Sequence, residues 1–191
     1  MSDTIRERKI ILRAQMIPRR AAVPDEIQKK VGQKIIDTLL AGMPPIPVIR
    51  RGTVLGLYAS IDGEPDFSGS LPELLRRGIV CCYPAVIDGR VIFRAVCDTE
   101  DFSIGMFGIR EPGPRSGTIA GEQIDVLLVP GLCFDRTGSR LGRGKGFYDR
   151  YLSRIDPQRK PFTIGTGYAF QMVDEVPARP GDVPMDYLIL P

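Results

Sequence analysis

The residues best suited to chemistry gather in one glycine-rich, basic segment, DRTGSRLGRGKGFYD, at positions 135–149. Three of its glycines alternate with Arg143 and Lys145. Glycine permits positive φ, so successive backbone N–H groups can converge on one anion, and the start of a following helix adds partial positive charge. Residues 134–154 carry six basic and two acidic side chains, although the net charge of the chain is only +3. This pattern predicts a phosphate-binding loop, with a solvent-exposed basic loop as the alternative.

The segment differs from the common phosphate-binding fingerprints. Gly146 follows Lys145 where a P-loop has serine or threonine, and the glycine spacing gives no GxGxxG in either register. The chain contains no histidine, which excludes catalytic triads and metal sites that depend on imidazole. Its four cysteines form no CxxC pair. We therefore expect reduced thiols and a cytoplasmic protein.

The elements that position this segment alternate between helix and strand. Apolar spacing predicts helices over residues 4–17, 24–42, 71–78 and 147–152, with Pro18 ending the first of them. Runs of β-branched and aromatic residues predict strands over residues 54–60, 79–83, 91–95, 126–129, 162–167 and 187–190. The Gly- and Pro-rich run 111–121 predicts a long loop.

These elements predict one α/β domain over residues 1–191, with an open, mainly parallel sheet flanked by helices in a Rossmann-like, three-layer arrangement. Ligands of such sheets bind beyond the carboxyl ends of the strands, which is where the segment 135–149 follows the strand 126–129. No stretch approaches the ~20 apolar residues of a membrane-spanning helix. The net charge is modest and RNA-binding motifs are absent, so we expect neither a membrane nor a nucleic-acid partner.

A set of motifs spreads over nearly the whole chain. The run DVLLVPGLCFD at 125–135 precedes Gly138 and RLGRGKGFYD at 140–149. Further motifs are Lys9 with Arg13, residues 58–64, GIREP at 108–112 and the run 176–182. In this order the motifs resemble those of the 5-formyltetrahydrofolate cyclo-ligase family, whose members are also called 5,10-methenyltetrahydrofolate synthetases.

The resemblance implies an enzyme that uses ATP and Mg²⁺ to close the formyl carbon of 5-formyltetrahydrofolate onto N10. The products are 5,10-methenyltetrahydrofolate, ADP and phosphate. This chemistry needs no imidazole, because phosphoryl transfer depends on alignment and charge stabilisation and the ring closure is intramolecular. The implied partners are the two small-molecule substrates, and we expect a monomer. A sugar-phosphate binder is the alternative, and it would not need carboxylates as metal ligands.

The resemblance also implies roles for individual residues. The ATP contacts would be Lys9, Arg13, Arg140, Leu141, Gly142, Arg143, Gly144, Lys145, Gly146, Phe147 and Tyr148. The folate contacts would be Ala59, Glu64, Arg143, Gly144, Lys145, Gly146 and Phe147. The catalytic cations would be Lys145, at the bridging or γ-phosphate, and Arg143, with Arg140 as a further candidate. Asp149 and Asp182 would hold Mg²⁺, which prefers hard oxygen ligands.

Each of these side chains also has a purely structural explanation. Lys9 and Arg13 lie four residues apart and would form a solvated basic helix face. Glu64 in a Gly-Glu-Pro turn would be plain surface, and Asp149 would be a helix-start charge. The aromatic pair at 147–148 would either stack on a ligand ring or anchor its helix in the core, and the sequence does not choose between these two roles.

Overall fold

A seven-stranded sheet lies at the centre of the fold. In a computed structural model, which describes residues 2–105 and 108–191, its strands are β1 Val54–Gly56, β2 Val80–Ile87, β3 Arg90–Val96, β6 Thr118–Ile119, β7 Val126–Pro130, β10 Phe162–Thr166 and β11 Tyr187–Ile189. They pair in the order β11-β10-β7-β1-β2-β3-β6. The pairings from β11 through β2 are parallel, and those of β3 with β2 and β6 are antiparallel. The prediction of a mainly parallel sheet is confirmed.

Two short hairpins lie beside this sheet. One pairs β4 Phe102–Ile104 with β5 Arg110–Pro112, and the other pairs β8 Cys133–Phe134 with β9 Arg140–Leu141. The expected loop over residues 111–121 is therefore wrong in part, because it contains the end of β5, which pairs with β4, and all of β6, which pairs with β3. The expected strand 54–60 is too long, because the chain leaves the ladder after β1.

In the described part of the chain, four α-helices accompany the strands: α1 Ser2–Ala21, α2 Asp25–Ala41, α3 Leu71–Arg76 and α4 Phe147–Leu152. Helix α2 begins after Pro24 and ends at Gly42, whose φ of 64° is typical of a left-handed cap. The prediction that Pro18 ends the first helix is wrong, because α1 continues through it to Ala21. Burial of Met16 and Arg20 on either side of Pro18 outweighs the hydrogen bond that proline removes.

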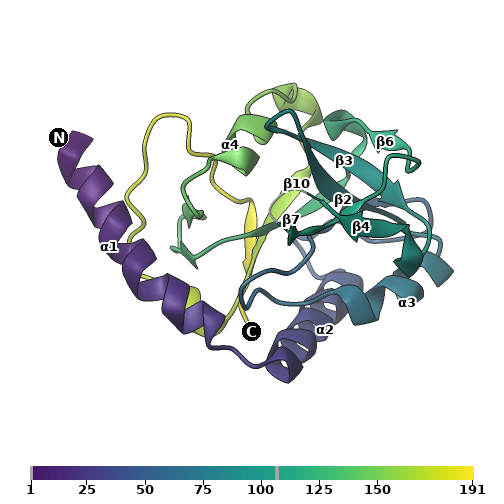
Figure 1. Cartoon of the computed structure of the whole chain (residues 1–191), viewed down its shortest axis with the longest axis horizontal. Helices are drawn as coiled ribbons and strands as arrows, with labels where there is room; N and C mark the ends of the chain where they lie inside the picture. Colours follow the sequence, from purple (N-terminus) through teal and green to yellow (C-terminus); the bar gives the residue numbers. More distant parts are fainter. Residues whose placement is uncertain (1, 106–107) are drawn as a thin grey trace.

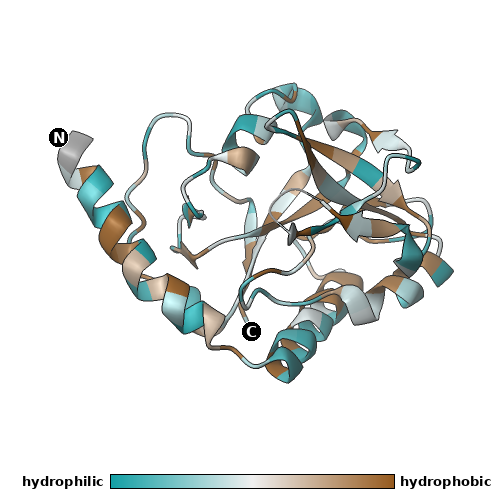
Figure 2. Cartoon of the chain, viewed as in Figure 1, coloured by the Kyte–Doolittle hydropathy of each residue, from teal (hydrophilic) through white to brown (hydrophobic). Residues whose placement is uncertain are grey.

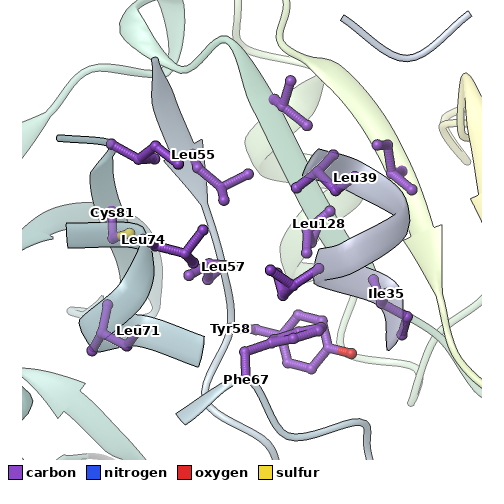
Figure 3. Close-up of a cluster of buried hydrophobic side chains, with 14 of the residues drawn as sticks. Ile35, Leu39, Leu55, Leu57, Tyr58, Phe67, Leu71, Leu74, Cys81 and Leu128 are labelled. Carbon is purple, nitrogen blue, oxygen red and sulfur yellow. The ribbon is translucent and has the colours of Figure 1, made fainter. Parts of the chain in front are cut away.

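Alternate residues of β7 serve the two faces of the sheet. Val126 and Leu128 pack in the cluster that α2 and α3 cover, which Figure 3 shows around Leu128. Leu127 and Val129 pack on the opposite face, with Leu152 of α4. Figure 1 shows the resulting layers, with α2 and α3 on one side of the sheet and α4 on the other. Both faces of the strand are covered, as its continuous apolar sequence predicts.

Helix α1 lies apart from these layers. Figure 1 shows it along one side of the molecule, and Figure 2 shows hydrophilic and hydrophobic residues mixed along its length. Its Met16 packs in a third cluster with Leu132 and Leu141, at the β8–β9 hairpin. This contact anchors α1 beside the glycine-rich segment. Among residues 2–105 and 108–191, no helix has the length and apolar character needed to cross a bilayer.

Candidate functional site

A cavity of about 1080 Å³ lies where α1 faces the residues that follow β1 and β7. Its walls come from α1, the segment 58–64, the β4–β5 hairpin and the glycine-rich segment. It is lined by every residue for which the sequence predicts a role, namely Lys9, Arg13, Ala59, Glu64, Arg140, Leu141, Gly142, Arg143, Gly144, Lys145, Gly146, Phe147, Tyr148, Asp149 and Asp182. The cavity lies beyond the carboxyl ends of the parallel strands β1 and β7, where the sequence predicts the ligand site.

Asp135 fixes the start of the glycine-rich segment. Its Oδ1 accepts hydrogen bonds from the backbone N–H groups of Thr137 and Ser139, at 2.9 and 3.2 Å, and its Oδ2 accepts one from Val176 at 2.8 Å. Burial alone would raise the pKa of Asp135, but these bonds and the Thr137 hydroxyl outweigh burial and lower it. The ionised carboxylate therefore holds the β8–β9 hairpin in place.

Two different constraints favour glycine in this segment: a positive φ at some positions and lack of space for a Cβ at another. Gly144 and Gly146 adopt positive φ, at 103° and 61°, as the sequence predicts. Gly142 does not adopt positive φ, and that part of the prediction is wrong; a Cβ there would lie 2.9 Å from the Arg140 guanidinium. Helix α4, which follows, has only six residues. The groups that this segment offers to an anion are therefore its backbone N–H groups and its cations rather than a long helix dipole.

Helix α1 supplies two cations to this wall. The Lys9 Nζ lies 2.5 Å from Asp182 Oδ2, and the Arg13 Nε donates to the Gly142 carbonyl at 3.0 Å. Lys9 is only 7% exposed, so the explanation as a solvated helix face is wrong for it. Burial would raise the pKa of Asp182, but Lys9 and the Arg179 N–H lower it overall. The carboxylate is therefore ionised inside the cavity.

Asp149 is the second acid of this wall. Its Oδ1 accepts hydrogen bonds from Arg140 Nη2 at 3.0 Å and from the Val183 N–H at 3.3 Å. The Val183 contact brings Asp149 next to the residue that follows Asp182. Each of the two aspartates bonds its cation through one oxygen, and its other oxygen accepts no hydrogen bond from the described residues.

These aspartates fit a Mg²⁺ site of one particular kind. Within the described part of the chain, no three acidic or cysteine side chains lie close enough to hold a metal by themselves. Mg²⁺ in nucleotide enzymes is commonly held by one or two carboxylates together with substrate phosphates. Asp149 and Asp182, each with an available oxygen in the phosphate-binding wall, match that pattern.

Glu64 follows β1 at the other wall of the cavity. It is only 5% exposed, so the explanation as a surface residue is wrong. Its Oε1 pairs with Arg20 Nη1 at 2.9 Å, and its Oε2 accepts a hydrogen bond from the Ile61 N–H at 3.3 Å. Burial raises the pKa of Glu64 although Arg20 and Arg143 oppose this.

The two walls meet at Arg143, whose guanidinium pairs with Asp62. The aromatic pair divides its roles. Burial raises the pKa of Tyr148, whose ring packs against the core beneath α4 and also lines the cavity. The centroid of the Phe147 ring lies 6.0 Å from Lys145 Nζ, and that of the Tyr148 ring lies 5.7 Å from the Arg140 guanidinium. Both side chains are half-buried and border cations of the cavity, and Tyr148 in addition packs against the core.

Sequence reasoning did not find two residues of this site. The sequence did not predict Arg20 because the expected helix ended before it. It did not predict Asp62 because a short polar turn is not typical of any particular chemistry. A helical continuation through Pro18 would have placed Arg20 on the same face as Lys9 and Arg13, since residues 9, 13 and 20 fall within about 40° at 3.6 residues per turn.

Known proteins share both the sequence and the fold of this chain. The profile of the 5-formyltetrahydrofolate cyclo-ligase family matches residues 5–191. The chain belongs to this family. It is 34% identical to the 5-formyltetrahydrofolate cyclo-ligase of Mycoplasma pneumoniae, over 95% of this chain and 97% of that protein. It is 29% identical to the cyclo-ligase of Escherichia coli, over 91% and 94%.

Solved structures extend the agreement to the cyclo-ligase fold. The NMR structure of Aquifex aeolicus 5,10-methenyltetrahydrofolate synthetase is similar with a TM-score of 0.79 and 31% identity, over 95% of this chain and 89% of that one. The family resemblance that the motifs indicate is confirmed over nearly the whole chain.

Proposed function

We propose that this cyclo-ligase family member converts 5-formyltetrahydrofolate and ATP into 5,10-methenyltetrahydrofolate, ADP and phosphate, with Mg²⁺ as cofactor. One observation carries the proposal: a single cavity gathers the cations of the glycine-rich segment, two aspartates and a buried glutamate. Such a site has separate groups for a polyphosphate, for a divalent cation and for a polar ring edge.

The glycine-rich wall is proposed to hold the triphosphate. Lys145 would contact the bridging or γ-phosphate oxygens, and Arg143 would stabilise charge on the phosphoryl group during transfer. The backbone around Gly144 would add N–H donors. Lys9 and Arg13 support this wall through Asp182 and the Gly142 carbonyl.

The pair Asp149 and Asp182 is proposed to hold Mg²⁺ through the oxygens that remain available. When bound, the ion would neutralise phosphate charge and help to align the γ-phosphoryl group. Arg140 pairs with Asp149 and Lys9 pairs with Asp182, and these ion pairs would orient the remaining oxygens.

The folate is proposed to lie against Ala59 and Glu64, with Phe147 beside it. A carboxylate accepts two parallel hydrogen bonds, so Glu64 is suited to the amide-like edge of a pterin. The segment with Gly144 and Lys145 would border both substrates, and this would bring the formyl oxygen to the γ-phosphate. Alignment of this kind supplies most of what phosphoryl transfer needs.

The reaction then needs no protein nucleophile. Transfer of the γ-phosphoryl group to the formyl oxygen makes that oxygen part of a phosphate leaving group and releases ADP. N10 attacks the formyl carbon, the carbon–oxygen bond breaks with release of phosphate, and the N10 proton passes to solvent. Arg143 and Lys145 would stabilise the negative charge that moves through both steps.

We also propose that the enzyme acts as a cytoplasmic monomer. A single chain supplies every group named above. All four cysteines are free thiols, and Cys81, Cys82 and Cys133 are buried. Reduced thiols of this kind are typical of proteins in a reducing compartment.

An absorbance assay tests the proposed reaction, because the methenyl product absorbs where the formyl substrate does not. We expect product from 5-formyltetrahydrofolate when both ATP and Mg²⁺ are present and none when either is omitted. An undiminished rate without nucleotide would overturn the proposal.

A further inference from the structure

Arg20 is a buried cation in the last turn of α1. It is 1% exposed and makes three contacts with two chain segments: its Nε donates to the Asp62 carbonyl at 3.2 Å, its Nη1 to the Gly131 carbonyl at 3.0 Å, and Nη1 also pairs with Glu64 at 2.9 Å. Its Nη2 is buried and has no hydrogen-bond partner among residues 2–105 and 108–191. The residue is also part of the cavity wall.

The contacts of Arg20 hold the end of α1, but folding does not by itself require a charged side chain there. A buried ion pair is often no more stabilising than apolar side chains of the same volume, because both charges must leave water. The unpartnered Nη2 adds a further unfavourable contribution. A role in the site therefore accounts for the charge of Arg20, in addition to its contacts at the end of α1.

The placement of Arg20 joins the two walls of the cavity. Lys9, Arg13 and Arg20 fall on one face of α1, spread over about 16 Å at 1.5 Å per residue. The first two contact Asp182 and the glycine-rich segment, and Arg20 contacts Glu64. Helix α1 thus contacts the glycine-rich wall near one end and Glu64 near the other.

We propose that Arg20 is a positioning residue for the folate, which fixes the direction of the Glu64 carboxylate. The inference rests on the proposed contact between Glu64 and the folate. The pair uses Oε1 of Glu64 and leaves further lone pairs on both carboxylate oxygens for a ligand.

The charges around Glu64 predict how the loss of Arg20 would change the pH dependence of folate binding. Burial raises the pKa of Glu64, and the largest opposing influence is Arg20. The other titratable groups that act on Glu64, or on which it acts, are Arg143, Asp62, Tyr58, Tyr148 and Tyr168. Loss of Arg20 removes the closest positive charge, so the carboxyl would take up its proton at a higher pH.

The test measures binding of 5-formyltetrahydrofolate by calorimetry from pH 5.5 to 9, together with the KM for ATP. The variants are Arg20→Met, Arg20→Lys and Glu64→Gln, with Arg19→Met as the matched control. Arg19 is the exposed neighbour of Arg20, contacts Phe170 and does not line the cavity.

We expect Arg20→Met to weaken folate binding about tenfold or more at neutral pH, the effect of one hydrogen bond to a charged group. The KM for ATP stays within about twofold, a change too small to represent a lost phosphate contact. The acidic limb of the binding profile moves to higher pH. Arg20→Lys restores much of the affinity and returns the acidic limb toward its parental pH. Arg19→Met behaves like the parent.

Three results would overturn the inference. In the first, Arg20→Met lowers the melting temperature but leaves the acidic limb in place, which would make Arg20 purely structural. In the second, Arg20→Met does not weaken folate binding although Glu64→Gln does. The role of Arg20 would then be wrong, and the proposed contact between Glu64 and the folate would stand. In the third, Glu64→Gln binds folate like the parent, so the proposed folate contact fails together with the role of Arg20.

Discussion

Replacing Gly144 with alanine tests whether the glycine-rich segment binds phosphate through its backbone. Gly144 has a φ of 103°, in the region that L-residues rarely adopt. A Cβ there would also lie 3.4 Å from Arg13 Cζ and 3.5 Å from Arg13 Nε, and that Nε holds the Gly142 carbonyl. The substitution therefore strains the backbone and crowds a neighbouring cation.

The two effects have separate magnitudes. A Cβ at positive φ costs about 1–2 kcal/mol, which lowers the melting temperature of a domain of this size by about 2–8 °C. Loss of one backbone hydrogen bond to a charged phosphate costs roughly 1.5–3 kcal/mol, and this raises the KM for ATP about ten- to 150-fold. Folate binding should change far less, because Glu64 stands on the other wall.

Gly52→Ala is the matched control. Gly52 also has positive φ, at 85°, and a Cβ there would meet nothing within 4 Å. It precedes β1 and does not line the cavity. Melting curves and steady-state kinetics of both variants separate strain from lost binding. If Gly144→Ala melts like Gly52→Ala and keeps the parental KM for ATP, the backbone account of phosphate binding is wrong.

Three further predictions concern single side chains. Lys145→Ala should raise the KM for ATP about ten- to 150-fold and leave folate affinity nearly unchanged, whereas Lys160→Ala, at an exposed lysine, should have no effect; equal kinetics of the two would make Lys145 a surface cation. Asp149→Asn should raise the Mg²⁺ concentration needed for half-maximal rate by at least about tenfold, the effect of a lost charge-assisted ligand; an unchanged titration would leave the metal to the phosphates alone. Asp135→Asn should lower stability at neutral pH by about 1–3 kcal/mol, because an amide N–H would face the Val176 N–H. Because folding lowers the pKa of Asp135, its ionised carboxylate stabilises the parent above the unfolded-state pKa of about 3.9, and this stabilisation is lost as the pH falls through the folded-state pKa. The thermal stability of the variant should therefore depend less on pH below about 4 than that of the parent. Equal pH profiles of the two proteins would refute this.

The sequence was most informative where local rules decide the structure. Pro24 and Gly42 bracket α2, and the apolar run at β7 predicts a strand covered on both faces. The glycine-rich segment was recognisable because its composition is unusual and its chemistry is local. These features do not depend on contacts with distant residues.

The remaining features depend on contacts that no local rule describes. Pro18 is compatible with α1 because residues on both sides of it are buried by other parts of the chain. The burial of Glu64 depends on Arg20, which lies 44 positions away in the sequence. Gly142 makes room for the Arg140 guanidinium, so only the folded structure separates its role from that of Gly144.

The most direct test of the account is the ratio of ADP released to methenyl product formed, measured in one reaction with Mg²⁺, ATP and 5-formyltetrahydrofolate. The account predicts one ADP for each methenyl product throughout the time course, and no ADP above background when the folate is omitted. Methenyl product formed without matching ADP would contradict the claim that phosphoryl transfer in this cavity drives the ring closure.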